Sequence, residues 1–181
     1  MLRWPCDPEF RSMNLGLGRN SGFPLWQIPE TALQPSSKPS RPAAPRLADF
    51  PIRVAEVIRF RDLDRQGHVN NAVFATYLEG GRVGLIYDPE QGLQVAGATT
   101  VLARIEIDFL KELHWPGTVE VGTAVAEIGQ SSYVFAQAVF HDGVCAATGR
   151  STMVLIDAAT RRSRPLPPDL IERLERLKNR G

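Results

Sequence analysis

The sequence predicts an α+β fold in which a curled antiparallel sheet of about five strands wraps around one long helix. Three observations support this fold class. One helical pattern covers residues 71–86, four long strand-like segments follow it, and short glycine-containing turns join those strands. Long antiparallel strands behind a single early helix form one sheet whose apolar side packs on that helix.

Residues 1–50 differ from the rest of the chain, because they contain eight prolines and no sustained hydrophobic period. The stretch 35–46 combines proline, serine and basic residues, which favours an extended, solvated chain. The sequence therefore divides into a disordered Pro-rich tail, 1–50, and one folded domain, 51–181. Two alternatives stay open for the tail: a wrongly assigned start codon, or a partner-docking arm that uses Trp4, Phe23, Trp26 and Ile28.

The helix is expected to begin near Asn71 and to end near Ile86. Asn70 can act as its N-cap, with the side-chain oxygen accepting a hydrogen bond from a first-turn N–H. Val69, just before the cap, can pack against Phe74 as a hydrophobic staple. The first-turn amides carry the positive end of the helix dipole, so they form a site for a carbonyl oxygen that gains negative charge.

Apolar residues recur along this helix at steps of three and four, which predicts one buried face. They are Phe74, Tyr77, Leu78, Leu85 and Ile86. Glycines at positions 80, 81 and 84 lower the intrinsic stability of the helix by up to about 1 kcal/mol each. These glycines would allow a strand or a second subunit to approach the helix backbone closely.

The strands are predicted from apolar and alternating segments bounded by turns. They cover residues 52–58, 99–113, 119–128, 132–140 and 144–157. In the second of them one face is expected to be buried, because Arg104, Glu106 and Asp108 alternate with apolar residues. The apolar set is Val101, Ala103, Ile105, Ile107 and Phe109. Residues 169–178 form an amphipathic C-terminal helix that caps the sheet or meets a neighbour.

The composition limits which partners and which cellular location are expected for the protein. A formal charge of +1 over 181 residues gives no field that attracts nucleic acid, and no apolar run is long enough to span a membrane. The N-terminus lacks the pattern of a signal peptide, so a cytoplasmic protein is expected. Cys6 and Cys145 have no metal-ligand spacing, so the sequence predicts neither a disulfide nor a zinc site.

The segment before the helix resembles a known motif. The pattern D-x-D-x-x-G-H-V-N-N-A followed by Y-L-E-x-x-R is similar to the start of hotdog-fold acyl-CoA thioesterases of the 4-hydroxybenzoyl-CoA thioesterase type. It consists here of Asp62, Asp64, residues 67–72, residues 77–79 and Arg82. The resemblance extends from about Pro51 to about Pro168. It implies hydrolysis of an acyl-CoA to a free acid and CoA, without a cofactor, in a homodimer or homotetramer with active sites at the subunit interface. A single sheet with open edges also predicts a homo-oligomer.

The resemblance implies that Asp64 carries the chemistry. An ordinary aspartate is ionised at neutral pH but is a weak base, so two roles stay open. Asp64 either attacks the thioester carbonyl to form a mixed anhydride or draws a proton from water. His68 can activate water or orient Asp64; the alternative is a histidine that satisfies backbone groups of the turn. Glu79 is a second candidate base, with a partly exposed residue near Arg82 as its alternative.

The other candidate residues serve substrate binding and the oxyanion. The backbone N–H of Asn71, or of a neighbour, would donate to the oxyanion, which contributes roughly 3 kcal/mol. Gly67 and Asn70 are assigned to the substrate site on the motif, although the side chain of Asn70 also suits a structural cap. Phe74 and Tyr77 could line an acyl tunnel or belong to the core.

Two other function classes compete with hydrolysis. A hotdog protein that binds acyl-CoA without turnover would not need the acid at Asp64, so it is the second choice. A hotdog hydratase would carry a D-x-N-P-x-H segment, which this sequence lacks.

Overall fold

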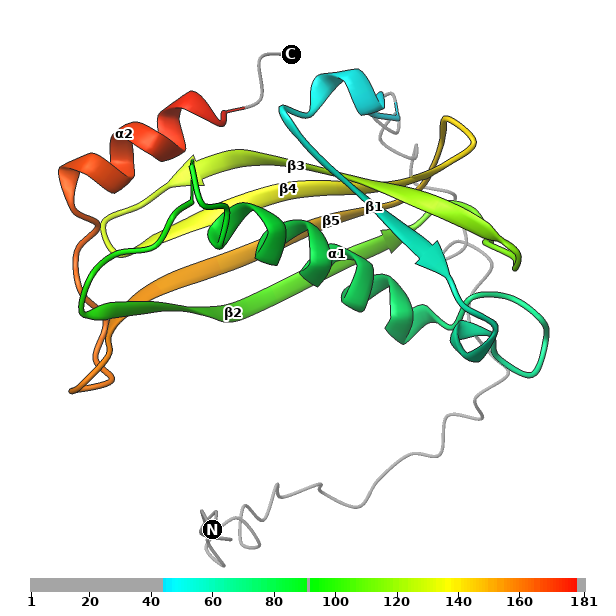
Figure 1. Cartoon of the computed structure of the whole chain (residues 1–181), viewed down its shortest axis with the longest axis horizontal. Helices are drawn as coiled ribbons and strands as arrows, with labels where there is room; N and C mark the ends of the chain where they lie inside the picture. Colours follow the sequence, from blue (N-terminus) through cyan, green and yellow to red (C-terminus); the bar gives the residue numbers. More distant parts are fainter. Residues whose placement is uncertain (1–43, 91, 179–181) are drawn as a thin grey trace, which may run out of the picture. The chain divides into compact units, whose positions relative to one another are not determined.

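The computed structural model describes residues 44–90 and 92–178, which form one five-stranded antiparallel sheet and two helices (Figure 1). The elements are β1 (Ile52–Ile58), α1 (Asn71–Ile86), β2 (Ala98–Phe109), β3 (Gly117–Ile128), β4 (Ser132–His141), β5 (Val144–Asp157) and α2 (Pro168–Arg176). The strand order is β1-β3-β4-β5-β2, so β1 and β2 form the two edges.

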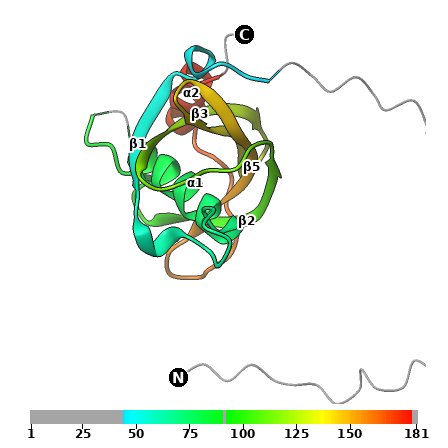
Figure 2. The same ribbon diagram turned by 90° about the vertical axis from the view of Figure 1, so that its right-hand side faces the viewer.

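The predicted fold is confirmed. Figure 2 shows the sheet curling around α1, which lies along the inner face. The 12-residue β3 and the 14-residue β5 are long enough to follow this curve, and every neighbouring pair of strands is antiparallel. In the described part of the chain, no helix is long and apolar enough to cross a membrane.

The N-terminus of α1 is fixed as the sequence predicts. The helix begins at Asn71, and the side chain of Asn70 accepts a hydrogen bond from the N–H of Ala72 at 2.9 Å. Val69 and Phe74 are 3% and 2% exposed and belong to the same apolar cluster, as a hydrophobic staple requires. The start of the helix is therefore held by both a polar and an apolar contact.

A polar network lies buried between α1 and the sheet. The Nη1 atom of Arg82 donates to the Gln137 Oε1 atom at 3.1 Å and to the Ser151 hydroxyl at 2.9 Å. Gln137 in turn donates through Nε2 to the carbonyl of Leu78 at 2.9 Å and to the Thr123 hydroxyl at 3.0 Å. Burial lowers the pKa of Arg82, while the nearby charge of Glu79 raises it. The guanidinium thus has neutral hydrogen-bond partners in the core.

The folded chain starts earlier than the boundary expected at Pro51. Phe50 is only 3% exposed and its ring meets Phe140 edge-on, with 5.9 Å between centroids. Leu47 packs against the same apolar cluster on the outer face of the sheet. Residues 47–50 therefore belong to the domain, because their apolar side chains cover this face. Residues 1–43 of the expected tail lie outside the described residues.

The amphipathic helix predicted at the C-terminus is confirmed as α2 and covers one end of the core. Leu170 and Leu174 are fully buried and cluster with Val125 of β3. The guanidinium of Arg173 contacts the carbonyl of Gly92 and the carboxylate of Asp169, the latter at 2.8 Å. The two leucines and the contact to Gly92 hold α2 against the sheet and the loop after α1, while the ion pair with Asp169 lies within the helix.

The burial predicted for one face of β2 is only partly correct. Ile105 and Ile107 are half-buried against the core, but Ala103 is exposed and Phe109 is 46% exposed. Two features explain the difference. The strand lies at the edge of the sheet, and its pairing with β5 skips a residue between Leu102 and Arg104, which changes the face that following side chains present.

The close approach predicted at the helix glycines occurs at Gly81. A Cβ atom at this position would lie 2.8 Å from the Val121 Cγ1 atom and 2.9 Å from the Thr123 hydroxyl. Gly81→Ala is expected to lower the free energy of unfolding by about 1–2 kcal/mol, because overpacking outweighs the better helix propensity of alanine. Urea denaturation measures this change.

Gly84→Ala is the matched control for this prediction. A methyl group there meets the Val54 Cγ2 atom at 3.2 Å, and Val54 is half-buried on an edge strand that can shift slightly. We expect an unchanged or slightly higher stability for this variant. Equal stability changes in the two variants would contradict close packing at Gly81.

Candidate active site

A tight turn between β1 and α1 positions the predicted acid. An antiparallel bridge joins Leu63 to Val69, and inside it the N–H of Asp64 donates to the carbonyl of His68 at 2.8 Å. The N–H of Gly67 donates to the carbonyl of Asp64 at 3.1 Å. Gly67 has a φ of 84°, a left-handed conformation that a side chain would strain. Gly67 therefore closes the turn.

Asp64 uses one carboxylate oxygen to hold this turn. Its Oδ1 atom accepts hydrogen bonds from the N–H groups of Gln66 at 2.7 Å and His68 at 3.3 Å. Among residues 44–90 and 92–178, no donor reaches the Oδ2 atom. The side chain is half-exposed, so this oxygen is open to water or a ligand. The acid is oriented by backbone donors and keeps one free oxygen.

The first residue of α1 offers a donor beside this acid. The N–H groups of Ala72 and Val73 are taken by the side chain and the carbonyl of Asn70. The N–H of Asn71 makes no hydrogen bond within the described segments. A first-turn amide has no partner inside its helix, and the helix dipole adds positive potential there. The N–H of Asn71 can therefore bind a developing oxyanion.

Asp64 and Asn71 both line one pocket of about 360 Å³. Its walls come from the turn, the start of α1 and the chain that leaves β2: Asp64, Gln66, His68, Val69, Asn71, Phe74, Phe109, Leu110, Lys111 and Glu112. The rings of Phe74 and Phe109 meet edge-on with 5.2 Å between centroids and form an apolar wall. Lys111 adds a cation to the lining. The pocket therefore combines an apolar wall with charged side chains of both signs.

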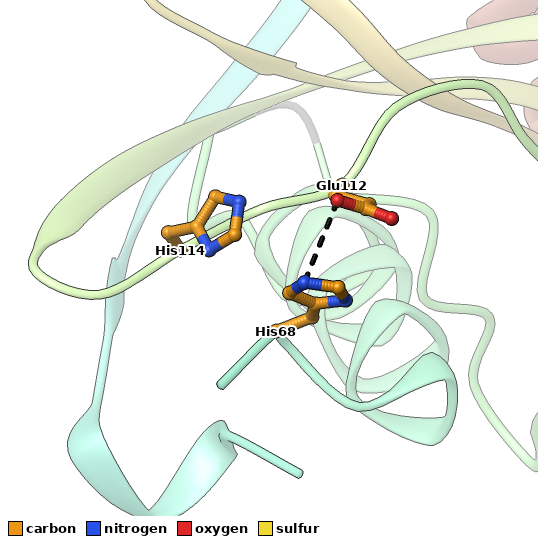
Figure 3. A group of neighbouring side chains, drawn as sticks. All are labelled: His68, Glu112 and His114. Atoms are coloured by element: carbon orange, nitrogen blue, oxygen red, sulfur yellow. Dashed lines mark ion pairs between the residues drawn. The ribbon is translucent and has the colours of Figure 1, made fainter. Parts of the chain in front are cut away.

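The predicted residue His68 lies beside two groups that the sequence did not single out. Its Nε2 atom is 3.5 Å from a carboxylate oxygen of Glu112, and its ring meets that of His114 edge-on at 5.0 Å (Figure 3). The His114 Nδ1 atom lies 3.4 Å from the carbonyl of Gly67. The signal in the sequence is the E-x-H spacing of residues 112 and 114, which puts both side chains on one side of an extended segment.

Four other candidates lie outside the lining of this pocket. Asn70 is the helix cap and Gly67 shapes the turn. Glu79 is exposed on α1. Tyr77 is 3% exposed and donates its hydroxyl hydrogen to the Asp62 carboxylate at 3.2 Å. Burial and the charge of Asp62 raise the pKa of Tyr77, so the hydroxyl stays protonated as a donor.

Asp62 supports the turn from inside. Its carboxylate accepts the N–H of Arg59 at 2.8 Å, and its carbonyl accepts the N–H of Asn70 at 2.9 Å. Together with Tyr77, these contacts tie β1, the turn and α1 to one buried acid. The two aspartates of the motif thus have different roles: one is buried and structural, and the other faces the pocket.

Comparison with known families identifies the chain. The sequence matches the thioesterase-like superfamily over residues 58–174. The protein belongs to this superfamily. The thioesterase-like region includes the turn, α1, all strands from β2 to β5 and most of α2. Comparison with curated proteins gave no match.

Solved structures agree with this thioesterase-like assignment. A thioesterase from Thermus thermophilus, crystallised with coenzyme A and Zn, is 37% identical; the match covers 69% of this chain and 98% of that one, with a TM-score of 0.60. A predicted thioesterase from Bacillus stearothermophilus is 26% identical over 70% and 96% of the two chains, with a TM-score of 0.63. A DHNA-CoA thioesterase from Staphylococcus aureus shares the fold at 20% identity, over 69% and 89%, with a TM-score of 0.61.

Proposed function

We propose that this protein is an acyl-CoA thioesterase that hydrolyses an acyl-CoA to a free acid and CoA. One observation carries the proposal: Asp64 and Asn71 line the same pocket, and within the described residues neither the Asp64 Oδ2 atom nor the Asn71 N–H has a hydrogen-bond partner. A thioester hydrolase needs a base or nucleophile next to an oxyanion donor, and these two groups supply both. The Thermus relative, which was crystallised with coenzyme A, supports the choice of a CoA thioester.

The chemistry follows one of two balanced routes. As a base, Asp64 takes a proton from water while the hydroxide attacks the thioester carbon, and the C–S bond then breaks to release CoA thiolate. As a nucleophile, Asp64 forms an acyl anhydride and expels the thiolate, and water then cleaves the anhydride. In both routes the carbonyl oxygen gains negative charge and binds the N–H of Asn71. The backbone N–H of His68 donates to the carboxylate of Asp64 at 3.3 Å and helps to position it, and the imidazole, which also lines the pocket, can orient water.

The pocket lining suggests how the substrate lies. Phe74 and Phe109 provide the apolar surface for the acyl group, and Lys111 provides a cation for the anionic carrier. Tyr77 is not part of this proposal, because its side chain is in the core. The direct test is release of free thiol from acyl-CoA by the wild-type protein.

We also propose that the protein is a homo-oligomer in which a second copy covers β2. This edge strand presents Leu102, 44% exposed, and Phe109, 46% exposed. An open edge with apolar side chains favours pairing with another strand. Phe109 also lines the pocket, so a copy that pairs along β2 would lie close to the substrate site.

Leu102→Lys is expected to convert the oligomer to a monomer, because a charge on an edge strand opposes pairing with a second copy. Light scattering coupled to size-exclusion chromatography measures the mass. Val57→Lys is the matched control, since Val57 is 60% exposed on β1, the opposite edge. The proposal fails if the wild type is monomeric, or if the Val57 variant dissociates and the Leu102 variant does not.

A further inference from the structure

Two backbone segments hold His68, Glu112 and His114 against one another. The N–H of Val69 donates to the carbonyl of Leu113 at 2.8 Å, and both of these side chains are buried, at 3% and 1% exposure. Because neighbouring side chains of an extended segment point to opposite sides, Glu112 and His114 project away from the core. His68 precedes Val69 and faces them (Figure 3).

The donor atoms are close enough to share one ion. One ligand atom from each of the three residues lies within 4.8 Å of the others. Zinc with nitrogen and oxygen ligands at about 2.1 Å needs ligand atoms roughly 3.4 Å apart in a tetrahedron. The His68 Nε2 to Glu112 Oε2 distance of 3.5 Å already fits, and the His114 side chain is exposed on the same side of its segment.

We propose that His68, Glu112 and His114 bind one divalent transition-metal ion, with Zn²⁺ as the preferred ion. Two imidazoles with one carboxylate form a ligand set that suits zinc, because imidazole nitrogen is a borderline donor, whereas magnesium and calcium prefer oxygen ligands alone. The sequence predicted no metal site because its two cysteines lack metal-ligand spacing. The ligands instead come from the turn before α1 and from the segment between β2 and β3.

The present contacts of the three side chains are weak enough for an ion to replace them. The Glu112 carboxylate is 67% exposed and meets His68 at 3.5 Å, a distance beyond a normal charge-assisted hydrogen bond. His114 has a long contact of 3.4 Å to the carbonyl of Gly67. Three protein ligands also leave one position of a tetrahedral ion for water or a ligand. Since His68 and Glu112 line the pocket, the ion would add positive charge at its rim.

The site is tested by metal binding, which does not depend on hydrolysis. Tag-free wild-type protein is titrated with Zn²⁺ by isothermal calorimetry in the presence of a competing chelator, and with Co²⁺ by visible absorption. We expect one saturable site per chain. His114→Ala and Glu112→Gln should each weaken Zn²⁺ binding by at least about tenfold, because even outer-shell changes at zinc sites have effects of this size.

Matched controls separate this site from other ligands. His141→Gln removes the third histidine, which lies at the β4–β5 turn beside Asp142, and should leave affinity unchanged. Cys6→Ser should also leave it unchanged. Melting curves confirm that each variant is folded. Absence of saturable binding overturns the proposal, as does unchanged binding in His114→Ala and Glu112→Gln, or loss of binding in either control.

Discussion

Asp64→Asn is expected to reduce the turnover of acyl-CoA by at least about a hundredfold, the lower end of the contribution of a general base. Asparagine keeps an oxygen that can accept the N–H groups of Gln66 and His68, so the turn should retain its shape. It has neither the charge nor the basicity of the carboxylate. The change therefore removes the base or nucleophile and keeps the hydrogen bonds that hold the turn. Thiol release at saturating substrate measures the effect.

Asp142→Asn is the matched control for this variant. Asp142 is 88% exposed in the β4–β5 turn and has a φ of 49°, a conformation that asparagine tolerates well. Its activity should equal that of the wild type. Thermal melting and molecular mass should not differ among the three proteins. Turnover by Asp64→Asn at the wild-type rate would remove Asp64 from the mechanism.

Gln137→Leu is expected to lower the free energy of unfolding by about 3 kcal/mol or more. The buried guanidinium of Arg82 loses one of its two acceptors in the network, and the carbonyl of Leu78 and the hydroxyl of Thr123 lose the amide donor. Removing one partner of a buried hydrogen bond to a charged group lowers stability by more than the bond itself contributed. The partner left behind stays buried without a hydrogen bond from protein or water. Urea denaturation monitored by circular dichroism gives the change.

A double variant, Arg82→Met with Gln137→Leu, tests the reason for this loss. Removing the charge together with its acceptor should restore part of the stability, since buried ionic networks can be replaced by apolar side chains. Gln130→Leu, at an exposed position, is the surface control and should change stability by less than about 0.5 kcal/mol. If Gln137→Leu falls within the same range, the network does not stabilise the fold.

Local signals in the sequence predicted α1 and its surroundings well. Asn70 as cap, Val69 with Phe74 as staple and Ile86 as the last residue all agree with the structure. These features depend on contacts within a few residues, which side-chain chemistry largely determines. Four of the five strands also agree to within two residues, because their alternation and turns are local patterns, whereas β2 ends at Phe109 and not at residue 113 as predicted.

Features that depend on which strands are neighbours were missed. Alternation in β2 indicated a buried face, but the strand is at an edge with a bulge near Ala103. Gln137 occupies an inward position between Phe135 and Val139, yet only the packed structure places Arg82 against it. His114 faces His68 because one long-range backbone hydrogen bond joins their segments. No pattern within one segment encodes such pairings.

The most direct test of the proposed function is thiol release from a panel of short, medium, long-chain and aromatic acyl-CoAs by the wild-type protein. We expect turnover of at least one member of the panel, with free acid and CoA in equal amounts. Absence of turnover across the panel, together with an increase in melting temperature on adding the same acyl-CoAs, would contradict hydrolysis. That result would identify a protein that binds acyl-CoA without cleaving it.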